Sequence, residues 1–196
     1  MNLDDPSIIK AISSNICQYV TVQTFVKALQ AVIIEEKIPE LIGPPRKLSE
    51  MEPFAFSRQT LQASKCILNR VPCENAFEMQ FAKFLQSSRE VTKFAKLPGR
   101  FGFAIEYTDS VANLRYYEPD FVVILENDDH YLVETKGRED QDVQHKDRAA
   151  KLWCEYATNL TKVNWQYLKI PQKEFDKLEP NEFSDLIVLG YEQKEL

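Results

Sequence analysis

One stretch of this sequence, residues 115–138, restricts the possible folds more than any other. Its two halves are rich in β-branched and aromatic residues, and the polar run ENDD at 126–129 separates them. This pattern predicts two antiparallel strands joined by a turn. The first strand contains Asp120, and the second contains Glu134 and Lys136. A strand has no structural need of these charged side chains, so we treat them as the first candidates for function.

The relative register of the two strands follows from the position of the turn. If the hairpin folds about Asn127, then Asp120 lies opposite Glu134, Val122 opposite Leu132 and Ile124 opposite His130. Successive side chains of a strand point to opposite faces, so Glu134 and Lys136 share a face. This register brings Asp120, Glu134 and Lys136 together on that face. A slip of one residue would move Asp120 to the opposite face.

The three side chains have the chemistry of a metal-dependent hydrolase. Two carboxylates that lie close together raise each other's pKa unless a cation lies between them. Mg²⁺ binds one or two carboxylates together with water and phosphate oxygens, and we expect that Mn²⁺ can replace it. A lysine beside them can orient the attacking water or stabilise negative charge in the transition state. The alternative is structural, because Glu-x-Lys on an exposed strand and Pro-Asp in a turn are both common.

The same residues carry a resemblance to a known family. Pro119-Asp120 followed by Glu134-Thr135-Lys136 resembles the signature of the PD-(D/E)XK nuclease superfamily. The wider sequence resembles the C-terminal endonuclease domain of type III restriction enzyme Res subunits and of their DEAD/DEAH-helicase relatives, over roughly residues 50–180. The segments that carry this resemblance are FGFAIEYTDS (101–110), LRYYEPDFVVIL (114–125), YLVETKGREDQDVQHKDRAAKLWCE (131–155) and WQYLKIPQKEF (165–175).

This resemblance implies a DNA endonuclease with a restriction-endonuclease-like fold. We expect Asp120, Glu134 and the main-chain carbonyl of Thr135 to bind the metal, and Lys136 to act at the attacking water or phosphate. In the resembled family an acidic residue on the helix before the sheet assists the metal. Glu78 matches that position, and Glu74 is the second candidate; a solvated glutamate at the helix edge is the alternative. The resemblance also implies a preceding helicase portion and a methyltransferase subunit as partners.

Hydrophobic periodicity predicts the remaining elements. Residues 1–48 form a helical N-terminal segment, which either packs on the nuclease core or is the tail of a helicase portion. Within it, Asp5-Pro6 marks one helix start and a second helix covers 22–37. The nuclease domain covers 49–196 and has an αβββαβ core, an α/β (α+β) fold with a mixed central sheet flanked by helices. Its first part contains residues 65–71 as an edge strand or connector, a helix at 74–86 and three strands: one at 101–107, one that contains Asp120 and one that contains Glu134. Its second part contains a helix at 140–160, a strand at 163–170, a helix at 172–178 and an edge strand at 186–191.

The overall charge bears on the expected substrate. The net charge of −6 argues against a simple electrostatic DNA-binding domain, because phosphate contacts need Lys and Arg. We therefore expect a partner or a helicase portion to supply most of the DNA affinity. Arg100, Arg115, Arg138 and Lys146 are the candidates for phosphate contacts; each arginine has the alternative of a solvated surface role. The alternative for Lys146 is that its stem covers apolar surface.

Several other functions find no support in the sequence. It has no Gly-x-x-x-x-Gly-Lys-Ser/Thr phosphate loop, so we expect no ATP site in this chain. Its four cysteines include no C-x-x-C pair, which favours reduced thiols, and neither histidine has the partners of a zinc site. No apolar run approaches the length of a membrane span, and we expect a cytoplasmic protein without membrane contact. A non-catalytic nuclease-fold module that binds DNA or protein is the rival class, and a nuclease acting on RNA is a third possibility.

Overall fold

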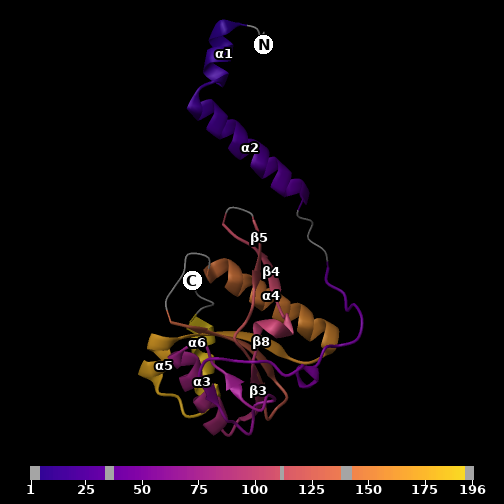
Figure 1. Cartoon of the computed structure of the whole chain (residues 1–196), viewed down its shortest axis with the longest axis vertical. Coiled ribbons are helices and arrows are strands. Elements are labelled where there is room, and N and C mark those ends of the chain that lie inside the picture. Colours follow the sequence, from indigo (N-terminus) through magenta and orange to yellow (C-terminus); the bar gives the residue numbers. More distant parts are fainter. Residues whose placement is uncertain (1–4, 34–37, 111–112, 138–142, 193–196) are drawn as a thin grey trace. The chain divides into compact units, whose positions relative to one another are not determined.

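The computed structural model describes residues 5–33, 38–110, 113–137 and 143–192. The chain divides into two compact units: one contains the helices before Pro39, and the other contains the central sheet and begins at Glu40 (Figure 1). The domain boundary that we predict between residues 48 and 49 stays a prediction.

The N-terminal unit contains two helices, α1 (Pro6–Ile12) and α2 (Asn15–Ile33). Asp5 caps α1, since its Oδ1 accepts a hydrogen bond from the Ser7 amide at 2.8 Å and Pro6 occupies the first turn. The break after Ile12 places Ile16 in α2, which therefore begins seven residues before the predicted helix at 22. No helix in the described part of the chain is long and apolar enough to cross a membrane.

A four-stranded mixed sheet forms the centre of the second unit. Its strand order is β3-β6-β7-β8, in which β3, β6 and β7 are antiparallel neighbours and β8 is parallel to β7. Two two-stranded sheets pair β1 with β2 and β4 with β5. The strands are β1 (Thr60–Leu61), β2 (Val71–Pro72), β3 (Val91–Lys96), β4 (Ile105–Thr108), β5 (Leu114–Tyr117), β6 (Phe121–Leu125), β7 (His130–Lys136) and β8 (Trp165–Pro171).

Helices cover both faces of the central sheet. The helix α4 (Val143–Thr161) makes the crossover that a parallel β7–β8 pair requires, and it packs on the face that also carries β4 and β5. The opposite face is covered by α3 (Ala76–Ser87), α5 (Gln172–Leu178) and α6 (Ser184–Glu192) (Figure 1). Short 3₁₀ turns are η1 (Leu48–Glu50) and η2 (Gly99–Phe101). The order α3, β3, β6, β7, α4, β8 confirms the predicted αβββαβ core.

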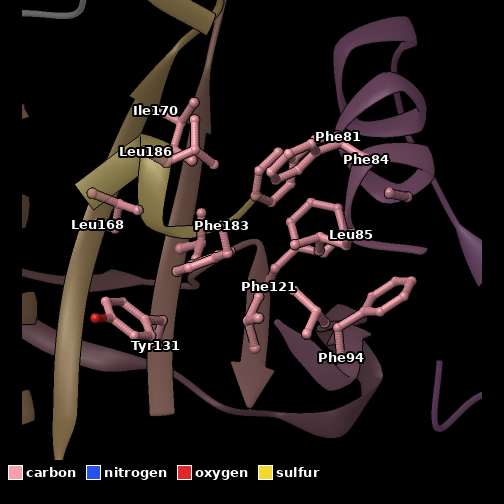
Figure 2. Packing of buried hydrophobic residues seen from close by; sticks show 14 of the residues in the cluster. Phe81, Phe84, Leu85, Phe94, Phe121, Tyr131, Leu168, Ile170, Phe183 and Leu186 are labelled. Atoms are coloured by element: carbon pink, nitrogen blue, oxygen red, sulfur yellow. The ribbon is translucent and has the colours of Figure 1, made fainter. Parts of the chain in front are cut away.

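The larger core lies between α3 and the sheet. Figure 2 shows Phe81, Phe84 and Leu85 of α3 extending toward the strands, where Phe121 lies. The Phe81 and Phe121 rings meet edge to face, with centroids 5.2 Å apart. The apolar stripe of this helix consists of Phe77, Phe81, Phe84 and Leu85, which are all buried. Burial of four such side chains fixes the orientation of α3 relative to the sheet.

The register predicted for the central hairpin is confirmed. Its Cα partners are Phe121 with Val133, Val122 with Leu132, and Ile124 with His130. Alternation places Phe121 and Val133 in the core below α3, whereas Leu132 packs in the core below α4. One step beyond the Phe121–Val133 pair, the same register places Asp120 opposite Glu134.

Two strand predictions are wrong, and a glycine and a proline explain why. The first core strand is β3 rather than residues 101–107, where Gly102 adopts φ +68° and only the part from Ile105 on is extended. That part pairs with β5 in a separate sheet. The strand predicted across 115–125 is split into β5 and β6 at Pro119, which lacks the amide needed for continuous pairing.

The edge strand predicted at 186–191 is also wrong, because this segment lies in helix α6. Leu186 and Leu189 are buried at helical spacing, while Val188 is 55% exposed. Residues 65–70 are a connector with one isolated bridge, in which Cys66 pairs with Phe94 of β3, and Val71 begins β2.

Candidate active site

Asp120 lies at the end of the sheet, in the turn between β5 and β6. Its Oδ2 accepts hydrogen bonds from the amide of Thr135 at 2.8 Å and from the Thr135 hydroxyl at 2.6 Å. Thr135 lies between Glu134 and Lys136 on β7. The contacts of Asp120 therefore attach the Pro119-Asp120 turn directly to the Glu-Thr-Lys segment.

A lysine that the sequence analysis did not single out also contacts Asp120. Lys96 is the last residue of β3, and its Nζ lies 2.8 Å from Asp120 Oδ1 and 3.7 Å from Glu78 Oε1. Its side chain is only 8% exposed. Burial acts to lower the pKa of Lys96, but the negative charges of Asp120 and Glu78 outweigh burial and raise it. Lys96 is therefore a buried ammonium ion that links the sheet to α3.

Glu78 is the acidic partner that α3 supplies. Its Oε2 accepts from the Glu74 amide at 2.7 Å and its Oε1 accepts from Asn75 Nδ2 at 2.9 Å, while Asn75 Oδ1 caps the Glu78 amide at 2.9 Å. This reciprocal arrangement resembles a capping box. Glu78 is buried, so the solvated alternative is wrong, and burial raises the pKa of its carboxyl. The second candidate, Glu74, is 62% exposed beside Arg58.

Glu134 lies in a partly buried environment on the α4 side of the sheet. The Tyr117 hydroxyl of β5 donates a hydrogen bond to its Oε2 at 3.0 Å. Burial and, after it, the negative charge of Asp120 raise the pKa of Glu134 to about 7, against the opposing effects of Tyr117 and Lys136. Asp120 thus lies near enough to Glu134 for its negative charge to raise the pKa of Glu134.

A second polar group surrounds Tyr117. On β8, the Tyr167 hydroxyl donates to Asp147 Oδ1 at 2.7 Å, and Lys169 Nζ donates to Asp147 Oδ2 at 2.5 Å. Lys169 is the Cα partner of Glu134 in the parallel β7–β8 pair. Burial, followed by the proximity of Tyr167, raises the pKa of the Tyr117 hydroxyl, which therefore stays protonated as the donor to Glu134.

These side chains enclose a small hollow beside Glu134. Its volume is about 10 Å³, which is the space of about one water molecule. It is lined by Tyr117, Glu134, Lys136, Lys146, Asp147, Tyr167 and Lys169. Lys136 and Lys146 thus line the same hollow as Glu134, while the roles predicted for these two lysines stay predictions.

The predicted arginine contacts lie in different places. Arg115 is 56% exposed on β5 and pairs with Asp109 at 3.0 Å. Arg100 is exposed in η2 and lines a separate hollow with Arg46 and Lys47. Arg138 lies outside the described residues.

The donor set fits a hard divalent cation that keeps most of its ligands from water and substrate. A carboxylate offers about four acceptor positions. Asp120 uses three of them for Lys96 and Thr135, and Glu134 accepts a hydrogen bond from Tyr117. About one acceptor position of Asp120 therefore stays available for a further ligand. Within the described residues there is no cluster of three His, Cys, Asp or Glu side chains that could hold a metal.

Sequence reasoning missed Lys96, Tyr117 and the Asp147–Lys169 pair. The signal for Lys96 was weak, because VTKFAK at 91–96 combines a short apolar pattern with two lysines. Cys17, Cys66, Cys73 and Cys154 are free thiols, and all of them except Cys17 are buried.

Comparison with known families is consistent with this geometry. Residues 64–174, more than half of the chain, match the family model described as an endonuclease domain. The chain belongs to this family. The matched region runs from the connector before β2 to α5 and includes every residue of the site. Membership suggests a nuclease, and hence a hydrolase, that acts on DNA. No curated protein and no solved structure matches the chain.

Proposed function

We propose that this chain is a Mg²⁺-dependent endonuclease that hydrolyses DNA phosphodiester bonds. The observation that supports this most directly is the attachment of Asp120 to the Glu-Thr-Lys segment, through the 2.8 Å hydrogen bond from the Thr135 amide. This contact attaches the turn that carries Asp120 to the residue next to Glu134, at one end of the sheet. Asp120, Glu134 and the Thr135 carbonyl would hold the cation.

The chain's own residues have distinct roles in this proposal. A bound divalent cation would supply Lewis-acid activation of the phosphate and a more acidic water. Lys136, at the same hollow as Glu134, orients the attacking water or stabilises charge on the phosphate. Tyr117 fixes the orientation of the Glu134 carboxylate through its hydrogen bond. Lys96 and Thr135 do the same for Asp120.

The more specific part of the proposal is that this chain acts in a type III restriction system. It rests on the resemblance of residues 101–110, 114–125, 131–155 and 165–175 to Res-subunit nuclease domains. In such a system a helicase portion and a methyltransferase subunit would bring the DNA to this domain. The net charge of −6 is consistent with a nuclease that relies on such partners for much of its DNA affinity.

The direct test is plasmid cleavage by the purified chain and by its Glu134→Gln variant. Supercoiled DNA is incubated in Mg²⁺, in Mn²⁺ and in EDTA. We expect nicking that needs the metal and falls at least about a hundredfold in Glu134→Gln, because a neutral amide cannot replace an anionic metal ligand. Circular dichroism of both proteins should be identical.

Glu126→Gln provides the matched control. Glu126 is exposed at the turn end of the same β6–β7 hairpin, so its loss of charge leaves the site unchanged. We expect full nicking activity in this variant. Equal cleavage by the wild type and Glu134→Gln would show that the nuclease site lies elsewhere.

One observation favours the rival class, a non-catalytic nuclease-fold module. Lys96 and Thr135 together provide three hydrogen bonds to Asp120, which stabilise its negative charge without a metal. In such a module Asp120 would be structural, and the chain would bind DNA or a protein without hydrolysis. Mn²⁺ or DNA binding with no cleavage of DNA or RNA in any metal would support this rival. The same cleavage assay on single-stranded RNA shows whether the chain prefers DNA or RNA as its substrate.

A further inference from the structure

A basic hollow is formed by residues 44–52 together with η2, the turn that follows β3. Its volume is about 570 Å³, which is in the size range of ligand sites. Three cationic side chains line it, Arg46, Lys47 and Arg100, along with the carboxylates of Glu50 and Glu52. The three cationic residues are exposed, so an anion can reach them from solvent.

Two of these cationic side chains have contacts that leave their charge available. The Arg46 guanidinium lies over the Phe101 ring of η2, with its carbon Cζ 5.1 Å from the ring centroid. This contact orders the side chain without neutralising it, so its N–H groups can still bind a phosphate. Lys47 pairs with Glu50 at 3.6 Å, and the two side chains are 66% and 63% exposed. Such a surface pair is weak, and a phosphate can replace its carboxylate.

A second hollow extends this basic surface. Its volume is about 500 Å³, and it shares Met51 and Glu52 with the first. Its cationic residues are Arg58 and Arg70, and both are exposed. Five cationic side chains and two carboxylates line the two hollows, which gives them a net charge of +3 in a chain whose net charge is −6. Such a concentration of positive charge is typical of a surface that binds nucleic acid.

The basic hollow is attached to the candidate active site through the main chain. Lys96 contacts Asp120, and the next amide, that of Leu97, donates to the Asp120 carbonyl at 2.7 Å. Arg100 follows Lys96 by four residues, so their Cα atoms are at most roughly 14 Å apart. Along one strand of B-DNA this length corresponds to about four nucleotides. A DNA strand bound in the basic hollow would therefore reach Asp120 within a few nucleotides.

We propose that the basic hollow, through Arg46, Lys47 and Arg100, binds the phosphate backbone of the DNA strand beside the cleavage position. This inference rests on the proposed function, which supplies DNA as the substrate. Contacts to phosphates hold the strand in place without reading its bases. An acidic protein segment would suit the same charges, and the short connection to Asp120 favours DNA over it.

The test is DNA binding by the full chain in EDTA, where metal-dependent cleavage does not occur. Fluorescence anisotropy of a labelled oligonucleotide measures the affinity at several salt concentrations. The variant Arg46→Gln/Lys47→Gln/Arg100→Gln removes three charges at exposed positions. We expect its affinity at about 50 mM salt to fall at least about tenfold. The slope of log affinity against log salt should become smaller by about 2 to 3, because fewer counterions are released from the DNA.

The matched control is Lys83→Gln/Lys173→Gln/Lys177→Gln. It changes the net charge by the same amount at exposed positions on α3 and α5 that line neither hollow. We expect its affinity to stay within about twofold of the wild type, with an unchanged salt slope. Circular dichroism of the three proteins checks that their folds are the same.

Unchanged affinity in the hollow variant, or an equal loss in the control, would overturn the inference. A wild type that binds no DNA in EDTA at low salt would overturn it as well. Polyglutamate that displaces the oligonucleotide as well as unlabelled DNA of equal charge would assign the basic hollow to an acidic protein segment instead. These outcomes leave the proposed function open to its own test, because metal-dependent nicking and its loss in Glu134→Gln are measured separately.

Discussion

At the scale of single residues, Glu134 combines partial burial with a neighbouring negative charge. Both effects favour its protonated form, and they raise its pKa from 4.5 to about 7. The carboxyl therefore gives up its proton near neutral pH in the metal-free protein. A cation bound beside Glu134 would favour the ionised form, so metal binding should strengthen as the pH rises through this range.

The same shift predicts how the stability of the metal-free protein depends on pH. Between about 4.5 and 7 the folded chain holds a proton on Glu134 that the unfolded chain has released. The free energy of unfolding contributed by this group therefore falls as the pH rises through this interval, by at most roughly 3 kcal/mol. Urea denaturation in EDTA at pH 5 and pH 8 measures this effect.

Glu134→Gln supplies the comparison, because an amide does not titrate. We expect a smaller loss of stability between pH 5 and pH 8 in the variant than in the wild type. Other groups, such as Glu78, titrate in both proteins and cancel in the difference. Identical pH dependence in the two proteins would contradict the raised pKa of Glu134.

At the scale of elements, the N-terminus of α3 connects helix capping to the site. Asn75 accepts from the Glu78 amide and donates to the Glu78 carboxylate, and both contacts are 2.9 Å. The capping residue thus holds the acid that pairs with Lys96 of β3. A change at this cap should affect both the stability of the helix and the position of Lys96.

Asn75→Ala tests the structural part of this connection. The substitution removes the cap and one hydrogen bond to Glu78, and we expect the free energy of unfolding to fall by about 1–2 kcal/mol. Chemical denaturation measures it. Asn69→Ala, at an exposed position outside any helix, is the control and should change stability by less than about 0.5 kcal/mol. Equal effects of the two substitutions would mean that the cap is not stabilising.

At the scale of the whole molecule, the sheet-bearing unit contains both hydrophobic cores. All members of the two buried clusters lie between Ala63 and Leu189. The helices α1 and α2 form a separate compact unit, in which apolar residues such as Ile16 and Phe25 are 78% and 64% exposed. Within the part of the chain that the structure describes, no buried side chain of these cores comes from the N-terminal unit.

Removal of residues 1–39 tests the independence of the two units. We expect residues 40–196 to unfold cooperatively, with a melting temperature within about 2 °C of the full chain, because both cores are retained. Differential scanning calorimetry of the two proteins measures this. A broad or absent transition in the shorter protein would show that the N-terminal helices are required for folding.

The sequence by itself determined the central hairpin and most helices. Period-two alternation and the polar run at 126–129 gave the correct register, and with it the proximity of Asp120 to the Glu134 segment. Helical spacing likewise identified α3 and the exact bounds of α5. These features depend on local patterns, in which a few neighbouring residues decide the conformation and the buried face.

Only the tertiary structure decided which strand completes the sheet and which side chains surround the acids. Lys96 reaches Asp120 because β3, rather than residues 101–107, pairs with β6, and Tyr117 reaches Glu134 from a separate two-stranded sheet. These contacts join segments that are 24 and 17 residues apart in the chain. Pairing between segments so far apart in the chain depends on how all the helices and strands bury their apolar faces together. A local sequence pattern does not contain this information.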